Sequence, residues 1–147
     1  NLSPHILNNF GLVRGIKNFV DKVASMHDHD IIFRTRLTDE RFDSNTEVIL
    51  YRIVCELVNN SLKHSNCNRI TIDLNIVNDK LVVTYRDNGK GFNLRDVEER
   101  GMGLSNIKSR ISTLGGRFEI TSSPGNGMMA RAEVSASNGV MRLADEE

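Results

Sequence analysis

The sequence predicts an α+β fold, a two-layer sandwich in which one layer of helices covers one mixed β-sheet. Two observations lead to this prediction. Segments with alternating apolar residues come in pairs joined by short turns, and segments with apolar residues at helical spacing lie between those pairs. Because paired antiparallel strands break strict strand–helix–strand alternation, a purely parallel sheet is excluded.

The composition fits one globular domain that has no net charge and no apolar run of membrane-spanning length. The 147 residues suffice for one core, with 39% hydrophobic and 26% charged residues. Nineteen basic residues balance nineteen acidic ones, so no field attracts nucleic acid and no nucleic-acid partner is expected. No apolar run approaches the ~20 residues of a membrane span. The two cysteines, Cys55 and Cys67, lack metal-ligand spacing and cannot form a framework of several disulfide bridges, which points to a reducing compartment.

The first half of the chain predicts helix, strand and helix. Apolar residues at near-helical spacing from Ile6 to Val23 predict one or two helices, and the β-branched run Ile31–Arg36 predicts a strand. A long amphipathic helix is predicted over Thr46–His64. Ser44–Glu47 has the form of a capping box, in which the serine and glutamate side chains bind free amides at the helix start.

The second half predicts two hairpins around a further helix. Ile70–Ile76 and Leu81–Tyr85 alternate and are joined by Asn78-Asp79, which is typical turn chemistry. After a glycine-rich stretch, apolar residues predict a helix over Leu104–Leu114, ended by glycines. A second hairpin, turning at Pro124–Gly127, completes the sheet.

Polar side chains share one face of the predicted Thr46–His64 helix. Glu56, Asn60, Lys63 and His64 follow at helical spacing. A carboxylate can orient or deprotonate a nucleophile, an asparagine oxygen suits Mg²⁺, and a lysine can meet phosphate charge. The alternative for this cluster alone is an ordinary solvated helix face.

Two glycine-containing motifs follow. In Asp87–Gly91 the glycines allow close backbone approach, and the aspartate at a strand end can accept a hydrogen bond from an exocyclic amino group such as that of adenine; the alternative is a plain turn. Gly101–Leu104 leads into a helix N-terminus, where free amides can hold phosphate. This second motif is neither a P-loop nor a dinucleotide fingerprint. Taken alone, Gly125–Gly127 is only a hairpin turn.

Together, in this order, the motifs resemble the Bergerat ATP-binding fold of gyrase, Hsp90 chaperones, histidine kinases and MutL proteins. Within that superfamily the chain resembles the catalytic domain of a two-component sensor histidine kinase. Glu56–His64 resembles the N box, and Asp87–Gly91, Gly101–Leu104 and Gly125–Gly127 resemble the three glycine boxes. Flanking segments resemble the subfamily of nitrate and lipid-fluidity sensors: Tyr51–Val54, Ser105–Arg110 and Leu114–Gly116.

The resemblance implies that the chain binds Mg²⁺–ATP and donates the γ-phosphate to a histidine. Asn60 would coordinate Mg²⁺, Glu56 would act near the phosphates or the attacking histidine, and Asp87 would accept from the adenine amino group. Lys63 and His64 would face the phosphate chain. The remaining nucleotide-binding positions implied by the glycine boxes are Gly89, Gly91, Gly101, Gly103, Leu104, Gly125 and Gly127.

The resemblance also implies a domain organisation and partners. Residues 1–25 would be the end of a dimerisation helix and its linker, residues 26–136 the catalytic domain, and residues 137–147 a C-terminal tail. The acceptor histidine would lie upstream of Asn1, on the protein's own dimerisation domain. A response regulator and a second copy in a homodimer would be the further partners. The chain would be the cytoplasmic part of a sensor anchored in a membrane, although it holds no membrane segment itself.

Two other functions remain open from the sequence. One is a serine kinase of the same ATP-binding fold, of the anti-sigma-factor type, which Lys63 and His64 disfavour. The other is a non-catalytic nucleotide-binding pseudokinase module. Glu56, Asn60 and Asp87 disfavour it, whereas Met128 favours it, because the family usually has threonine there.

Overall fold

A computed structural model describes residues 5–96 and 103–136. In these ranges the chain forms a five-stranded sheet in the order β1-β2-β3-β5-β4. The strands are β1 (Asp30–Thr35), β2 (Arg69–Val77), β3 (Lys80–Asp87), β4 (Arg117–Ser122) and β5 (Met128–Ser135). β1 runs parallel to β2, and all other neighbours are antiparallel, so the predicted mixed sheet is confirmed.

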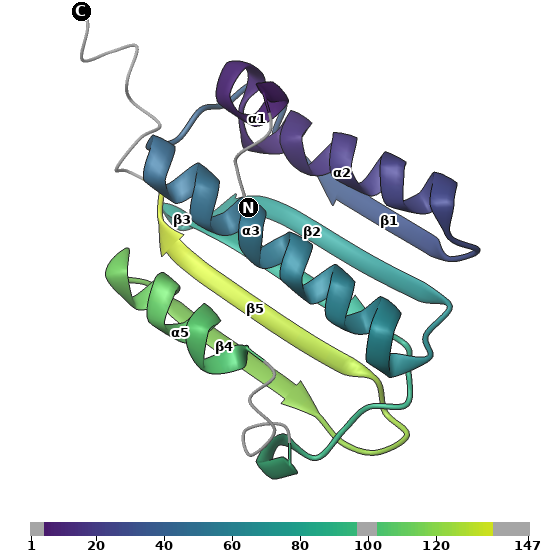
Figure 1. The fold of residues 1–147 in the computed structure, drawn as a ribbon. Coiled ribbons are helices and arrows are strands. Elements are labelled where there is room, and N and C mark those ends of the chain that lie inside the picture. Colours follow the sequence, from purple (N-terminus) through teal and green to yellow (C-terminus); the bar gives the residue numbers. More distant parts are fainter. Residues whose placement is uncertain (1–4, 97–102, 137–147) are drawn as a thin grey trace, which may run out of the picture.

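The helices lie on one face of this sheet (Figure 1). They are α1 (His5–Phe10), α2 (Leu12–Met26), α3 (Ser44–Asn60) and α5 (Leu104–Thr113), and α3 continues as one π-helical turn, η1 (Ser61–Ser65). In Figure 1, α2 lies beside β1 at one edge, α3 crosses the middle, and α5 lies over β4 at the other edge. The two-layer sandwich predicted from the sequence is therefore confirmed.

The core lies between the two layers and includes the N-terminal helices. Leu7 of α1 and Ile16 of α2 are fully buried, in one cluster with Ile53 of α3 and Ile72 of β2. Residues on both sides of the predicted boundary between residues 25 and 26 thus pack in the same core. The predicted tail, 137–147, lies outside the described residues. No helix in the described ranges is long and apolar enough to cross a bilayer.

The turn between β2 and β3 confirms the predicted hairpin. Asn78 and Asp79 have φ values of 51° and 64°. Positive φ at both central residues is the geometry of a type I′ turn, whose twist matches that of paired strands, and asparagine and aspartate tolerate it best after glycine. The register follows, with Val77 opposite Lys80 and Ile70 opposite Asp87. This pairing brings Asp87 to the end of the sheet where η1 lies.

The capping box predicted at Ser44–Glu47 was wrong. The residue that caps α3 is Asp43, whose carboxylate accepts hydrogen bonds from the amides of Asn45 (3.1 Å) and Thr46 (3.4 Å). Because the cap lies one residue earlier, Ser44 is already helical and Glu47 falls one position too late to close the box. Glu47 instead turns into the protein and binds Arg41.

Candidate functional site

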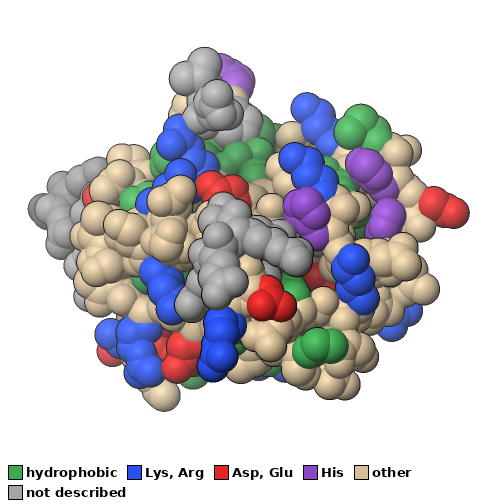
Figure 2. Space-filling view, turned by 60° about the horizontal axis from the view of Figure 1, so that its bottom comes forward, with side chains coloured by type: hydrophobic (Ala, Val, Ile, Leu, Met, Phe, Trp, Pro, Cys, Tyr) green, Lys and Arg blue, Asp and Glu red, His purple; other side chains and the backbone are tan. Residues whose placement is uncertain are grey.

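A cleft of about 410 Å³ opens where η1, the end of β3 and the start of α5 meet. This volume is in the range of small-molecule sites. The apolar residues that line the cleft are Leu57, Phe92, Leu104, Ile120, Pro124 and Met128. The polar residues that line it are Asn60, Ser61, Lys63, His64, Ser65, Asp87, Lys90, Asn93 and Asp96, together with Gly91. Figure 2 views this end of the molecule, where basic, acidic and histidine side chains lie close together.

Asp87 is held firmly in the wall of the cleft. Its side chain is buried, with a relative exposure of 8%. Ser61 donates its hydroxyl hydrogen to Oδ2 (2.6 Å), and the amide of Gly89 donates to Oδ1 (3.0 Å). An ionised carboxylate can accept about four hydrogen bonds. Each oxygen of Asp87 therefore keeps the capacity to accept from the N–H group of a ligand.

Tyr85 fixes the serine that holds Asp87. Its hydroxyl donates to the carbonyl oxygen of Leu57 (3.0 Å) and lies 2.5 Å from Oγ of Ser61. Burial raises the pKa of Tyr85 well above its ordinary value, so its hydroxyl keeps its proton. Since Ser61 gives its one hydroxyl hydrogen to Asp87, the tyrosine hydroxyl is the donor in its short contact with Ser61 and shares its proton between Oγ of Ser61 and the carbonyl oxygen of Leu57. The result is a buried chain that orients the carboxylate from behind.

The end of α3 supplies the other predicted polar groups. The π-helical turn is wider than an α-helical one, and such turns are frequent at functional sites. Asn60, Lys63 and His64 all line the cleft, and their roles toward a ligand remain predictions. Among the hydrogen bonds of the described residues, none involves the side-chain amide of Asn60. Its oxygen is a hard ligand beside two basic groups, so this rim fits a magnesium ion and phosphates.

Glu56 lies next to the cleft rather than in its lining. Arg110 of α5 donates from Nη1 to its Oε1 (2.5 Å), with both side chains partly exposed. Its other oxygen lies 3.9 Å from where a β-carbon on Gly103 would stand. Glu56 therefore lies at the start of α5, held there by an ion pair that the sequence did not predict.

Gly103 and Leu104 form the start of α5. Gly103 has a φ of 83° and precedes the first helical residue, and Leu104 is buried against the cleft. A helix N-terminus offers amides without helical partners, as the predicted phosphate cradle requires. Gly101, the other glycine of that motif, lies outside the described residues.

The remaining glycines allow three loops to pack against each other. A β-carbon on Gly89 would collide with the carbonyl oxygen of Ser65, and one on Gly127 with that of Asp87. Gly91 lines the cleft, but a β-carbon there would meet the carbonyl oxygen of Ser123. These contacts are internal to the protein, and the ligand-facing role of the glycines remains a prediction. Gly125 has open space around it, and its amide donates to Lys90 O (2.6 Å).

Sequence reasoning missed Ser61, Tyr85 and Ile120. For Ser61 a signal exists, because it stands four residues after Leu57 on the apolar side of the helix. A hydroxyl on a buried helix face needs a hydrogen-bond partner, so a polar group opposite could have been expected. Nothing local distinguishes Ile120, which reaches the cleft only through the sheet order.

A larger groove of about 700 Å³ runs along α5 and β4 and shares Leu104 and Ile120 with the cleft. Its polar groups include Lys108, Glu119 and Arg131. None of these is held by a buried hydrogen-bond chain like that behind Asp87. The cleft, whose carboxylate is fixed by such a chain, is therefore the better candidate for specific binding.

Comparisons with known proteins show the family to which the chain belongs. Residues 45–138 match the family described as histidine kinase-, DNA gyrase B- and HSP90-like ATPase. The chain is similar to the sensor histidine kinase ComP of Bacillus subtilis (strain 168), with 34% identity over 139 residues, covering 90% of this chain and 18% of ComP. It is also similar to the sensor protein VraS of Staphylococcus haemolyticus (strain JCSC1435), with 36% identity, covering 92% of this chain and 38% of VraS. The chain thus spans well under half the length of either relative.

Solved structures confirm the fold. The Erythrobacter litoralis EL346 blue-light activated histidine kinase superposes with a TM-score of 0.69 at 18% identity, covering 86% of this chain and 42% of that one. The catalytic domain of histidine kinase ThkA superposes with a TM-score of 0.68 at 18% identity, covering 85% of this chain and 90% of that one.

Proposed function

The chain belongs to the family of histidine kinase-, DNA gyrase B- and HSP90-like ATPases, and from that premise we propose that it is the catalytic domain of a sensor histidine kinase. In this proposal it holds Mg²⁺–ATP and donates the γ-phosphate to a histidine on the protein's own dimerisation domain. The observation that carries the proposal is the contrast in burial within one cleft. The carboxylate of Asp87 marks its buried end, whereas Asn60 is half-buried and Lys63 and His64 are exposed at its open end.

The buried end suits adenine. Apolar side chains can stack on or enclose a flat base, and the carboxylate of Asp87 can accept from its exocyclic amino group. Because Ser61 and the Gly89 amide already donate to this carboxylate, its orientation is set before a ligand arrives. A pre-oriented acceptor loses little entropy on binding. Met128, which lies opposite Asp87 in the sheet, adds apolar surface here instead of a hydroxyl.

The open end suits the phosphate chain. Lys63 and His64 lie on the rim beside Asn60, and the first amides of α5 lie across the cleft. In the bound state Mg²⁺ would neutralise phosphate charge, and Asn60 would be the protein's ligand to it. Glu56, held at the start of α5, would lie near the phosphates or the attacking histidine. These residues then bind and orient the triphosphate. Phosphoryl transfer depends chiefly on such positioning and on stabilisation of the phosphate charge.

Histidine as the acceptor is favoured by the relatives, which carry the names of sensor kinases. We propose accordingly that the partners are the protein's own dimerisation domain in a homodimer and a response regulator that takes the phosphate. The catalytic domain would act in the cytoplasm. The serine-kinase alternative predicts a different phosphorylated residue, and the non-catalytic alternative predicts none.

One experiment separates the three functions. This chain alone and the full-length protein are incubated with Mg²⁺ and γ-labelled ATP, and the label is tested for acid stability. We expect the chain to bind ATP by titration calorimetry but to stay unlabelled, including at His5, His27, His29 and His64. The full-length protein should acquire an acid-labile label, as phosphohistidine gives.

Three other outcomes would contradict the proposal. An acid-stable label would indicate a serine kinase, and ATP binding without label in the full-length protein would indicate a non-catalytic module. A label on the isolated chain, mapped to any of its histidines, would overturn the division of labour between the domains.

A further inference from the structure

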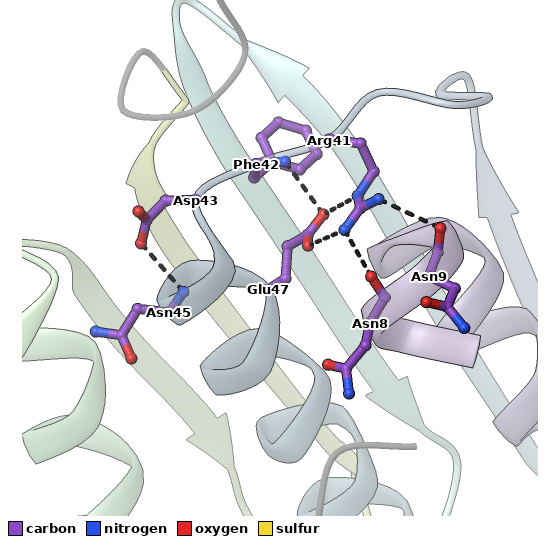
Figure 3. Close-up of polar contacts among 7 residues, drawn as sticks. All are labelled: Asn8, Asn9, Arg41, Phe42, Asp43, Asn45 and Glu47. Carbon is purple, nitrogen blue, oxygen red and sulfur yellow. Dashed lines mark hydrogen bonds and ion pairs between the residues drawn. The ribbon is translucent and has the colours of Figure 1, made fainter. Parts of the chain in front are cut away.

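Arg41 joins the start of α3 to the end of α1 (Figure 3). Its Nε and Nη2 atoms donate to the two carboxylate oxygens of Glu47, each at 3.1 Å. On the other side, Nη2 donates to the carbonyl oxygen of Asn8 (3.2 Å) and Nη1 to that of Asn9 (3.5 Å). One guanidinium group therefore binds two helices at once.

Glu47 holds Arg41 in this place. The carboxylate is buried, with a relative exposure of 2%, and it also accepts from the amide of Phe42 (3.1 Å). Leaving a buried carboxylate without its partner is strongly unfavourable. The pairing also uses the planar fork of arginine, which lysine cannot reproduce. Arg41 is thus fixed to the first turn of α3, whatever happens to α1.

The contact with α1 is specific to the end of that helix. The last carbonyls of a helix have no helical partners and carry partial negative charge, so a cation is favourable there. Leu7, one residue earlier, is fully buried and packs against Gly15 of α2. An apolar anchor and a charged polar contact together determine how α1 lies on the domain.

The break between α1 and α2 lies at Gly11, which is in close contact with the side chain of Arg41. Gly11 has a φ of 94°, and a β-carbon on it would lie 2.6 Å from Cδ of Arg41 and 3.3 Å from Oε2 of Glu47. Any other residue at this position would push the arginine away from Glu47. The positive φ and this close approach together give the reason for a glycine here.

We propose that Arg41 and Glu47 are positioning residues for phosphoryl transfer, which set the direction in which the preceding helix leaves the catalytic domain. This inference rests on the proposed function, since the acceptor histidine would lie on that preceding segment. α3 has 17 residues and spans roughly 25 Å at 1.5 Å per residue. Arg41 at its start is therefore too far from the cleft at its end to touch a nucleotide. Arg41 can instead change the position of the acceptor histidine relative to the nucleotide.

The test uses two variants of the full-length protein and one control. Arg41→Lys keeps a charge for Glu47 but loses the fork that reaches Asn8 and Asn9. The double variant Arg41→Met with Glu47→Gln removes both charges and keeps an acceptor for the Phe42 amide. The control is Arg34→Met, because Arg34 also forms a two-bond ion pair, with Asp73, but on the sheet and away from α1. ATP affinity, the KM for ATP and kcat of autophosphorylation are measured for each.

We expect both Arg41 variants to keep the parent's ATP affinity and KM while kcat falls on the order of tenfold to a hundredfold, as misplacement of a reacting group costs. Arg34→Met should match the parent in all three quantities. An unchanged or raised kcat in either Arg41 variant overturns the inference, and so does a parallel loss of ATP binding and transfer, which would indicate a role in folding alone. If the parent itself forms no phosphohistidine, the proposed function fails instead.

Discussion

Ser61 in η1 donates a hydrogen bond of 2.6 Å to Oδ2 of Asp87 at the end of β3. The two residues are 26 positions apart, and both are buried. The bond ties the helix that carries Asn60, Lys63 and His64 to the strand that carries the candidate adenine acceptor. The two ends of the cleft are therefore held at a fixed separation by a contact in its wall.

Replacing Asp87 with asparagine should abolish or strongly weaken ATP and ADP binding while leaving the fold intact. An asparagine can present its amide donor where adenine also donates, and an unsatisfied polar contact costs about 1–3 kcal/mol, or more for a charged group. Titration calorimetry measures the affinity, and circular dichroism checks the fold. The matched control is Asp73→Asn, which changes a partly exposed carboxylate on β2. Parent-like affinity in folded Asp87→Asn would refute the adenine assignment.

Asn60→Ala should weaken ATP binding in the presence of magnesium far more than adenosine binding without metal. Mg²⁺ is usually held by one or two protein groups together with phosphates, so the loss of one protein ligand matters. Both affinities are measured on the same preparation, with EDTA in the metal-free titration. If both affinities fall equally, Asn60 has a structural role in α3 and the metal is bound elsewhere.

Gly127→Ala should destabilise the domain much more than Gly125→Ala. Both glycines have positive φ, at 65° and 83°, which costs alanine about 1–2 kcal/mol. Only at Gly127 would the new methyl group also collide with a backbone atom, the carbonyl oxygen of Asp87. We expect a total cost of roughly 3 kcal/mol or more there, measured by urea unfolding. Equal costs at the two sites would contradict the packing described for the glycine loops.

The two cysteines should react slowly with iodoacetamide in the folded protein. Burial raises the pKa of Cys55 to about 11, and burial also raises that of Cys67. Because the thiolate is the nucleophile, at pH 8 only about one thousandth of a thiol with such a pKa is reactive. The rate should rise about tenfold per pH unit up to the pKa and reach ordinary values in urea. Alkylation of folded Cys55 as fast as free cysteine would contradict the burial.

Much of the fold could be predicted because its signals are local. Alternation over Ile70–Ile76 and Leu81–Tyr85 with Asn78-Asp79 between them predicts a hairpin from neighbouring residues alone, and the structure confirms it. Helical spacing likewise places Asn60, Lys63 and His64 together, and the structure brings them to one cleft. The order of the glycine motifs identified the family. Periodicity and turn chemistry act within a few residues, so a sequence displays them directly.

Only the tertiary structure decided which distant groups meet. The hydrogen bond from Ser61 to Asp87 joins residues 26 positions apart. The ion pair of Glu56 with Arg110 spans 54 positions, and the hydrogen bond from Arg41 to the carbonyl oxygen of Asn8 spans 33. Even the cap of α3 was misassigned, because two adjacent residues, Asp43 and Ser44, can both cap a helix and the burial of Glu47 against Arg41 distinguishes them. These contacts depend on the strand order and on which side chains meet when the helices pack on the sheet. The sequence by itself determined the elements and the family, and the packing of those elements decided how the candidate site is held.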